Sequence, residues 1–229
     1  PFEFRMQNAL KPGDTMPNGQ IASEDTGIIE CLEKIKPYYD NYPTAGIACA
    51  LKNSGVGVGV PDTGRCILSV ENNIVHIRTS AACMGQGLAT VVLQICIETT
   101  KLHASQFIVE APDTRRTPNS GTSTASRQTA FTGEATRRAA EKLKAALEGS
   151  KLEDLEGQEF YGEFCYETDP ITSTKPHPIS HLAYSYSAQL VVLDDSGKVE
   201  RVIAVCDAGK VINQLSIEGQ IEGGVVMGL

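Results

Sequence analysis

The chain has 229 residues, of which 41% are hydrophobic, and this is enough to bury the core of one large or two modest domains. Its formal net charge of −8 at pH 7 argues against a dedicated nucleic-acid binder, because affinity for phosphates needs a surplus of Lys and Arg. No apolar run approaches the ~20 residues that span a bilayer, and the first ten residues carry both charge signs, unlike a signal peptide.

The seven cysteines indicate a reducing, cytoplasmic environment. Their number is odd and no two of them form a Cys-x-x-Cys pair, so neither a disulfide framework nor the spacing of a zinc or iron–sulfur site is indicated. Several lie within apolar segments, where a free thiol packs as a small hydrophobic group. The chain begins with Pro, and a helical pattern is still running at its last residue, so we expect a piece of a longer protein.

Residues 1–44 are predicted to form a helical leading segment. Residues 2–9 have the pattern of a helix end and are followed by the turn KPGD. Apolar residues recur at helical spacing over 24–39, which predicts a second helix, and Pro43 closes the segment. The apolar face of this second helix consists of Ile28, Ile29, Leu32 and Ile35.

Residues 45–157 are predicted to form a first α/β unit. GIACALKNSGVGVGV has the pattern of a Gly-rich strand, and the alternating runs RCILSVE and IVHIRTS, joined by Asn72-Asn73, predict a β-hairpin. LATVVLQICIETTKL predicts a buried helix, QFIVEA predicts a strand, and a long helix is expected over about 125–147. The predicted buried face of the long helix consists of Phe131, Ala135, Ala139 and Leu143.

Residues 158–229 are predicted to begin a second α/β unit that is truncated at the C-terminus. EFYGEFCYE, HLAYSYSAQLVVLDD and KVERVIAVCDAG have the patterns of strands, and the turn DDSGK joins the last two as a hairpin. A final helix is expected from about Leu215. The predicted fold class is therefore α+β, with mixed β-sheets and packed helices in two successive α/β units.

The sequence MGQG (84–87) lies between the predicted hairpin and the buried helix. Gly85 and Gly87 let a backbone approach a ligand closely, and the helix that follows directs unpaired N–H groups at that ligand. Gln86 adds an amide that both donates and accepts hydrogen bonds. An ordinary glycine turn before a helix explains the same pattern.

The stretch PNSGTSTASRQTAFTGEA (118–135) combines hydroxyls, glycines and arginine at another predicted helix start. A hydroxyl-rich loop beside free N–H groups and guanidinium groups suits a phosphate or pyrophosphate. A helix cap with solvated arginines is the simpler explanation, and it accounts for one of the five hydroxyls. The residues concerned are Ser120, Thr122, Ser123, Thr124 and Ser126, with Arg115, Arg116 and Arg127.

Other candidate site residues give weaker evidence of a ligand site. DAGKVINQLSIEGQIEGG (207–224) places Asp207 at a strand end beside glycine turns, which close helix packing explains equally well. His76 alternates within a strand and is expected to be structural, and His177 and His181 flank a proline at a spacing unsuited to a metal. Cys83 either faces a ligand beside MGQG or packs as a small core residue.

Three segments in this order, SAACMGQGLAT, DTRRTPNSGTSTASRQTAFTGEA and DAGKVINQLSIEGQIEGGVVMGL, resemble the molybdenum hydroxylases, the family of xanthine dehydrogenases and aldehyde oxidoreductases. EFRMQNALKPGDTMPNGQ is similar to the stretch that enters the family's second molybdopterin-binding region. The resemblance covers essentially the whole chain. The TASRQT form is most similar to that of the purine-hydroxylating bacterial branch, which includes selenium-dependent members.

The resemblance implies a fragment of the molybdopterin-binding subunit. The MGQG loop would lie beside the pterin and the molybdenum oxo group, and the second loop would lie around the molybdenum, the pterin and the phosphates of a molybdopterin cytosine dinucleotide. The implied cofactor-binding residues are Gly85, Gln86, Gly87, Thr124, Ala125, Ser126 and Gln128. The third segment, with Asp207, Asn213 and Gln220, matches the stretch that leads toward the catalytic region, and no metal ligand is implied in this chain.

The resemblance also implies the activity of the whole enzyme, an oxidoreductase that hydroxylates a purine or related N-heterocycle with water as the oxygen source. The family's glutamate general base lies in a Gly-Glu-Pro sequence that this chain lacks, so we expect the isolated fragment to be inactive and give Glu222 no such role. Iron–sulfur clusters and FAD are implied on partner domains or subunits of a cytoplasmic, oligomeric enzyme, with no nucleic-acid or membrane partner. Cys83 stands where many members have an acidic residue.

Two alternatives stay open. The hydroxyl-rich loop and the acidic composition also fit a stand-alone module that binds a nucleotide or another phosphorylated ligand. A purely structural domain that docks on partner subunits is the second alternative. The neighbouring coding sequence would separate these possibilities, since a continuation with Gly-Glu-Pro identifies the enzyme.

Overall fold

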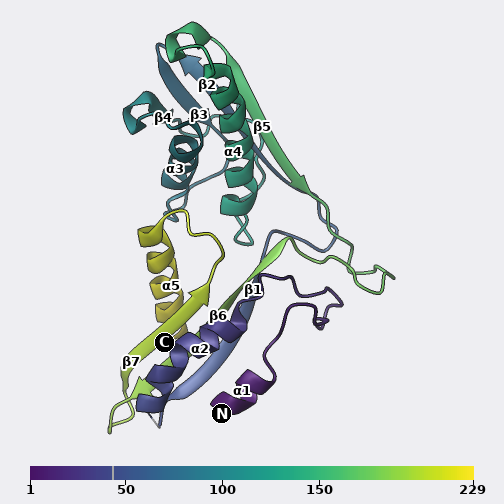
Figure 1. The fold of residues 1–229 in the computed structure, drawn as a ribbon, viewed down its shortest axis with the longest axis vertical. Helices are drawn as coiled ribbons and strands as arrows, with labels where there is room; N and C mark the ends of the chain where they lie inside the picture. The colour runs from purple at the N-terminus through teal and green to yellow at the C-terminus, as the bar shows by residue number, and fades with distance from the viewer. Residues whose placement is uncertain (43) are drawn as a thin grey trace. The chain divides into compact units, whose positions relative to one another are not determined.

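The strands of the chain form two separate sheets, each packed with helices (Figure 1). The computed structural model describes residues 1–42 and 44–229, so Pro43, predicted to close the leading segment, lies outside the described residues. The chain divides into unit 1, residues 1–53 and 169–229, and unit 2, residues 54–168. The α+β class with a mixed sheet is confirmed.

Unit 1 contains a three-stranded sheet in the order β1-β6-β7. β6 and β7 form the predicted antiparallel hairpin, and the DDSGK turn closes it with a hydrogen bond from Asp194 N–H to Lys198 O (2.8 Å). The apolar face of α2 packs on this sheet, with Leu32 and Ile35 fully buried. The elements are α1 (Phe2–Gln7), α2 (Ile28–Asn41), β1 (Gly46–Ser54), β6 (Ala183–Leu193), β7 (Val199–Asp207) and α5 (Gln214–Gly228).

Unit 2 contains a four-stranded sheet in the order β4-β3-β2-β5, with β3 and β4 parallel and the other pairs antiparallel. Helices α3 and α4 pack on one face of it and on each other (Figure 1). The elements are β2 (Asp62–Glu71), β3 (Ile74–Arg78), α3 (Leu88–Thr100), β4 (Phe107–Val109), α4 (Gln128–Leu147) and β5 (Glu159–Tyr166). Two short 3₁₀ turns, Ala104–Gln106 and Leu152–Leu155, precede β4 and β5.

Local sequence patterns account for the elements of unit 2. Asn72 and Asn73 join β2 to β3 with φ values of 53° and 61°, the left-handed pair that a two-residue hairpin turn requires and that Asn tolerates. The predicted stripe on α4 is confirmed, because all four of its residues are at most 1% exposed. Ala135, Ala139 and Leu143 of this stripe form one core with the inward residues of β2 and β3, among them Leu68, Val75 and Ile77.

Glycines bring α4 directly onto the strand backbones. A Cβ at Gly162 in β5 would stand 1.9 Å from Ala135 O, and one at Gly64 in β2 would stand 2.3 Å from Phe131 O. No side chain fits at either position, so the helix lies closer to the sheet than side-chain layers normally permit. The sequence shows these glycines but not the contact that requires them.

The division into units differs from the three successive segments expected from the sequence. β1, expected to open the first α/β unit, joins the sheet of unit 1, and β5, expected in the second, pairs with β2 in unit 2. Each unit is therefore assembled from strands far apart along the chain. Among the described residues, no helix has both the length and the apolar character needed to cross a bilayer.

Candidate functional site

Two loops of unit 2 lie against each other at the start of α3 and α4. We call residues 79–87 the Gln86 loop and residues 118–127 the Ser126 loop. The helices α3 and α4 pack side by side, and the segments that enter them meet. Two hydrogen bonds join the loops: Ser120 N–H to Ser80 Oγ (2.7 Å) and Ser123 Oγ to Ala82 O (2.7 Å). The structure thus brings together the two motifs that, by the resemblance, lie around one cofactor.

The Gln86 loop is shaped by its two glycines. Gly85 has φ of 111° and Gly87, the N-cap of α3, has φ of 77°, both in the region that favours glycine. A Cβ at Gly85 would meet no atom within 4 Å, so open space lies above this backbone. The Gln86 amide folds back on the loop, donating to Ala82 O (3.0 Å) and accepting from the N–H of Met84.

Cys83 lies in the same loop and is exposed, not packed in the core. Backbone N–H groups, that of Gly85 foremost and those of Leu88 and Gly87 after it, lower the pKa of the Cys83 thiol. Several backbone donors at the start of α3 therefore converge on one point and favour negative charge there. This is the donor chemistry that an anionic ligand needs.

The Ser126 loop presents hydroxyls on a strained backbone. Thr124 and Ser126 are exposed, and both Ala125 and Ser126 are left-handed, with φ of 49° and 50°. Two successive non-glycine residues in this region are uncommon and persist only where the surrounding contacts determine them. Gln128 is 7% exposed and points inward, where its Nε2 donates to Thr122 O (3.0 Å).

Arg127 and Ser120 are not available to a ligand, contrary to the sequence-based expectation. Arg127 is 1% exposed and forms an ion pair with Asp62, which neutralises its charge. Ser120 is fully buried, and its Oγ accepts from Arg65 N–H (2.8 Å). Local sequence could not show this, because Asp62 lies 65 residues before Arg127. The hydroxyls that face outward are those of the loop tip.

The third motif belongs to unit 1. Asp207 ends β7 and lies against Gly27, the N-cap of α2, where a Cβ would stand 2.2 Å from Asp207 Oδ2. A carboxylate is favoured at such a helix N-terminus. Asn213 caps α5 by accepting a hydrogen bond from Ser216 N–H (2.7 Å), and Gln220 is exposed on α5. These contacts give the motif a structural role within its own unit.

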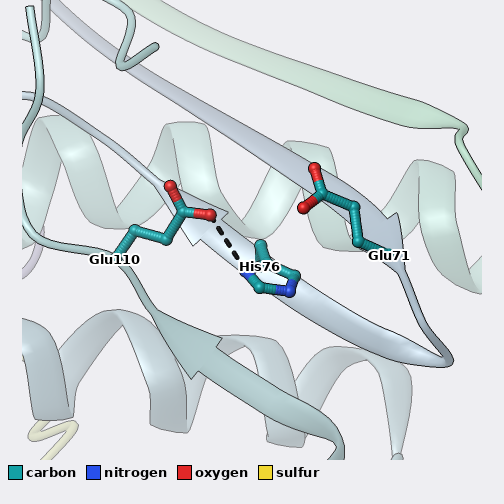
Figure 2. A group of neighbouring side chains, drawn as sticks. All are labelled: Glu71, His76 and Glu110. Carbon is teal, nitrogen blue, oxygen red and sulfur yellow. Dashed lines mark ion pairs between the residues drawn. The ribbon is translucent and has the colours of Figure 1, made fainter.

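Glu71, His76 and Glu110 form the one His and carboxylate group that could share a metal ion in the part of the chain that the structure describes (Figure 2). His76 Nδ1 lies 2.9 Å from Glu110 Oε1. The same oxygen of Glu110 also pairs with Arg78 (3.1 Å) and Arg116 (3.4 Å), and both arginines pair with Glu71 as well.

Two guanidinium groups already compensate these carboxylates. Hydrogen bonding from Arg78 lowers the pKa of Glu71, and it lowers the pKa of Glu110 against the opposing effect of burial. A divalent cation would have to displace the arginines from the oxygens nearest His76. We therefore interpret the group as a charge-compensated network. The expected structural role of His76 agrees with this placement, and His181 lies in a hydrogen-bonded cluster with Ser180.

Comparison with known proteins identifies the family. The family model described as "Molybdopterin cofactor-binding domain" matches residues 40–229. The chain is 25% identical, over its whole length, to the xanthine dehydrogenase molybdenum-binding subunit of Escherichia coli O157:H7, covering 37% of that protein. It is 25% identical to the 6-hydroxypseudooxynicotine dehydrogenase complex subunit gamma of Paenarthrobacter nicotinovorans, over 95% of the chain and 32% of that protein.

A solved structure shows the same fold. The aldehyde oxidoreductase of Desulfovibrio desulfuricans ATCC 27774 superimposes with a TM-score of 0.87 at 26% identity, over 99% of this chain and 28% of that one. The chain thus spans about a third of the length of these relatives. Both units, including their long-range strand pairings, lie within the matched region.

Proposed function

The chain belongs to the molybdopterin cofactor-binding domain family of the xanthine dehydrogenases and aldehyde oxidoreductases, and on this premise we propose that its paired loops hold a molybdenum cofactor. The observation that carries the proposal is the meeting of the Gln86 loop and the Ser126 loop at two helix N-termini. Open space above Gly85 and converging N–H groups at Cys83 suit an anionic, flat ligand that approaches the backbone closely.

Each predicted residue has a role in this proposal. Gly85 and Gly87 let the ligand reach the backbone, and the Gln86 amide would turn from its present partners to the pterin. The hydroxyls of the Ser126 loop and the backbone of Ala125 would hold the phosphates of a molybdopterin cytosine dinucleotide, while Gln128 supports the loop from inside. When bound, the cofactor supplies the redox centre of a hydroxylase.

We further propose that the whole protein is a molybdenum hydroxylase acting on a purine or related N-heterocycle, with water as the oxygen source. Iron–sulfur and FAD domains or subunits would carry the electrons away, and the relative from Paenarthrobacter nicotinovorans is itself one subunit of a dehydrogenase complex. A cytoplasmic location fits the free cysteines. Because the chain has no Gly-Glu-Pro sequence, we expect it to be inactive by itself, and measurable xanthine turnover by the 229-residue chain would contradict this.

The test measures cofactor retained by the native protein that carries this chain. Molybdenum and acid-released CMP are quantified in Gln86→Ala and Ser126→Ala, with Gln7→Ala and Ser150→Ala as exposed controls of the same residue types. A lost hydrogen bond to a charged group costs about 1.5–3 kcal/mol, so affinity should fall roughly tenfold or more in the two loop variants. Unchanged molybdenum and CMP in both would refute the proposal and favour a structural docking domain.

The stand-alone module is a second alternative, favoured by the hydroxyl-rich loop and the acidic composition. Calorimetry with CTP and ATP on the 229-residue chain separates it from the hydroxylase. Binding in the micromolar range by the chain alone, together with no molybdenum in the native protein, would favour the module. Molybdenum and CMP in the native protein would exclude it.

A further inference from the structure

The buried ion pair behind the Ser126 loop has no place among the predicted ligand contacts. Asp62 begins β2, Arg127 precedes α4, and they are 4% and 1% exposed. Removing two charges from water costs about as much as their pairing returns, so such a pair adds little net stability. What it does supply is a fixed geometry, because a guanidinium has five donors in a rigid plane.

The remaining donors of Arg127 reach the backbone of the Ser126 loop and of β2. Nη1 of Arg127 donates to Ser120 O (2.7 Å) and Thr122 O (3.1 Å), and Nη2 donates to Thr63 O (2.8 Å). Gly121, with φ of 73°, lies directly over the guanidinium, where a Cβ would stand 2.9 Å from Nη1. The loop is thus folded around this one side chain.

The acidic partner ties the loop to a second segment. Asp62 Oδ2 accepts a hydrogen bond from Val56 N–H (2.9 Å), and the neighbouring Gly55 N–H donates to Ala125 O (3.0 Å). Ala125 is one of the two left-handed residues, each of which costs of order 1 kcal/mol that the surroundings must offset. The ion pair and its hydrogen bonds therefore hold the strained backbone from both sides.

We propose that Asp62 and Arg127 are positioning residues for an anionic, phosphate-bearing ligand, which they never touch. They hold the Ser126 loop with its hydroxyls outward, and the Ser123–Ala82 hydrogen bond extends the order to the Gln86 loop. A loop already held in its binding conformation spares the ligand the entropy of ordering it. The inference rests on the proposed function for the ligand, whereas the ordering of the loop stands without it.

The experiment uses the native protein and two conservative variants. Arg127→Lys keeps the charge but not the planar fork, and Asp62→Asn keeps the shape but not the charge. The matched control is Arg137→Lys, an exposed arginine of α4 that pairs with Glu134 and Glu141. Hydrogen–deuterium exchange is followed over 119–128 and over the rest of α4, with molybdenum, acid-released CMP and Tm measured alongside.

We expect exchange over 119–128 to accelerate roughly tenfold or more in both Arg127→Lys and Asp62→Asn. Exchange in α4 beyond residue 135 should stay unchanged, and both variants should retain less molybdenum and CMP. Arg137→Lys should change neither the exchange over 119–128 nor the amounts of molybdenum and CMP retained. Exchange that rises no more than in the control, or equally throughout unit 2, overturns the positioning role whatever the ligand is. A local rise with full molybdenum and CMP also overturns it, while failure of the cofactor site itself is read separately from Gln86→Ala and Ser126→Ala.

Discussion

The two faces of the four-stranded sheet in unit 2 carry charge in different ways. On the face covered by α4, Asp62 and Arg127 are sealed from water, and each polar atom has a fixed backbone or side-chain partner. On the opposite face, Arg78 is shared among Glu71, Glu110 and Glu159, and the side chains of Glu71 and Glu159 are 38% and 57% exposed.

The difference lies in what each arrangement can specify. A desolvated pair with directed hydrogen bonds permits one geometry and is costly to break. The network of the opposite face lies beside an open depression of about 860 Å³, lined by His76 and by residues 108–116. Its outer carboxylates, Glu71 and Glu159, are open to water and salt, whereas the side chains of Arg78 and Glu110 are only 5% and 14% exposed. The covered face can therefore shape a binding loop, whereas on the opposite face one guanidinium is shared among three carboxylates, two of them open to water.

Breaking the covered ion pair should have the largest effect. Arg127→Met fills similar space but leaves the Asp62 carboxylate buried without its partner, which costs about 3–5 kcal/mol of the free energy of unfolding. Urea denaturation at neutral pH measures it. Arg137→Met, on the exposed side of the same helix, should cost less than about 0.5 kcal/mol. Equal losses of unfolding free energy in the two variants would mean that the buried Asp62–Arg127 pair is no more costly to break than the exposed pairs of Arg137.

Gly162→Ala tests the same face without any charge. The new Cβ would stand 1.9 Å from Ala135 O, so α4 must move away from β5, and we expect a loss of about 1–3 kcal/mol or more in urea denaturation. Gly219→Ala is the control, because nothing lies within 4 Å of its Cβ and Ala favours a helix by about 1 kcal/mol over Gly. A stabilised Gly162→Ala protein would show that the close approach of α4 is not required.

Local patterns predict most elements of this fold because their causes are local. The helical spacing of Phe131, Ala135, Ala139 and Leu143 and the Asn72-Asn73 turn need no information from elsewhere in the chain. The pairing of β1 with β6 joins strands more than a hundred residues apart along the chain, and no periodicity encodes it. The unit boundaries expected from the sequence therefore divide the chain into successive segments. The observed units are instead set by which strands pair in each sheet.

The candidate site also has features that local sequence predicts and features that depend on distant residues. Glycines and hydroxyls before a helix indicate a ligand loop, and the two loops do meet. Whether a particular arginine faces a phosphate or a buried carboxylate depends on which residues the fold brings next to it. Arg127 pairs with the buried carboxylate of Asp62. A helix start rich in Arg, Ser and Thr thus predicts where a site lies better than it predicts which of its residues touch the ligand.

The pH dependence of stability should separate the faces, with the smallest effect of the three predictions. The pKa of Glu110 is lowered from its ordinary value of 4.5, so its contribution is complete above that value and is lost as pH falls through the lower pKa of the folded state. Glu110→Gln removes this contribution of the ionised carboxylate to stability. Relative to wild type, the variant should be less stable by about 1 kcal/mol at about pH 7, and the deficit should shrink toward zero as the pH falls below the lowered pKa of Glu110 in the folded state.

The groups around Glu110 set the sign of that change. His76, Arg78 and Arg116 face its carboxylate with positive or protonatable groups, and Glu71 shares both arginines with it. Protonating Glu110 removes the attraction that the arginines supply, which Gln already lacks, so the two proteins converge in acid. Gly162→Ala has no titrating group, and its deficit in urea denaturation should stay constant over the same range. A Glu110→Gln deficit that is equally constant would show that the charge of Glu110 adds nothing to stability, and it would contradict the lowered pKa of this carboxyl group.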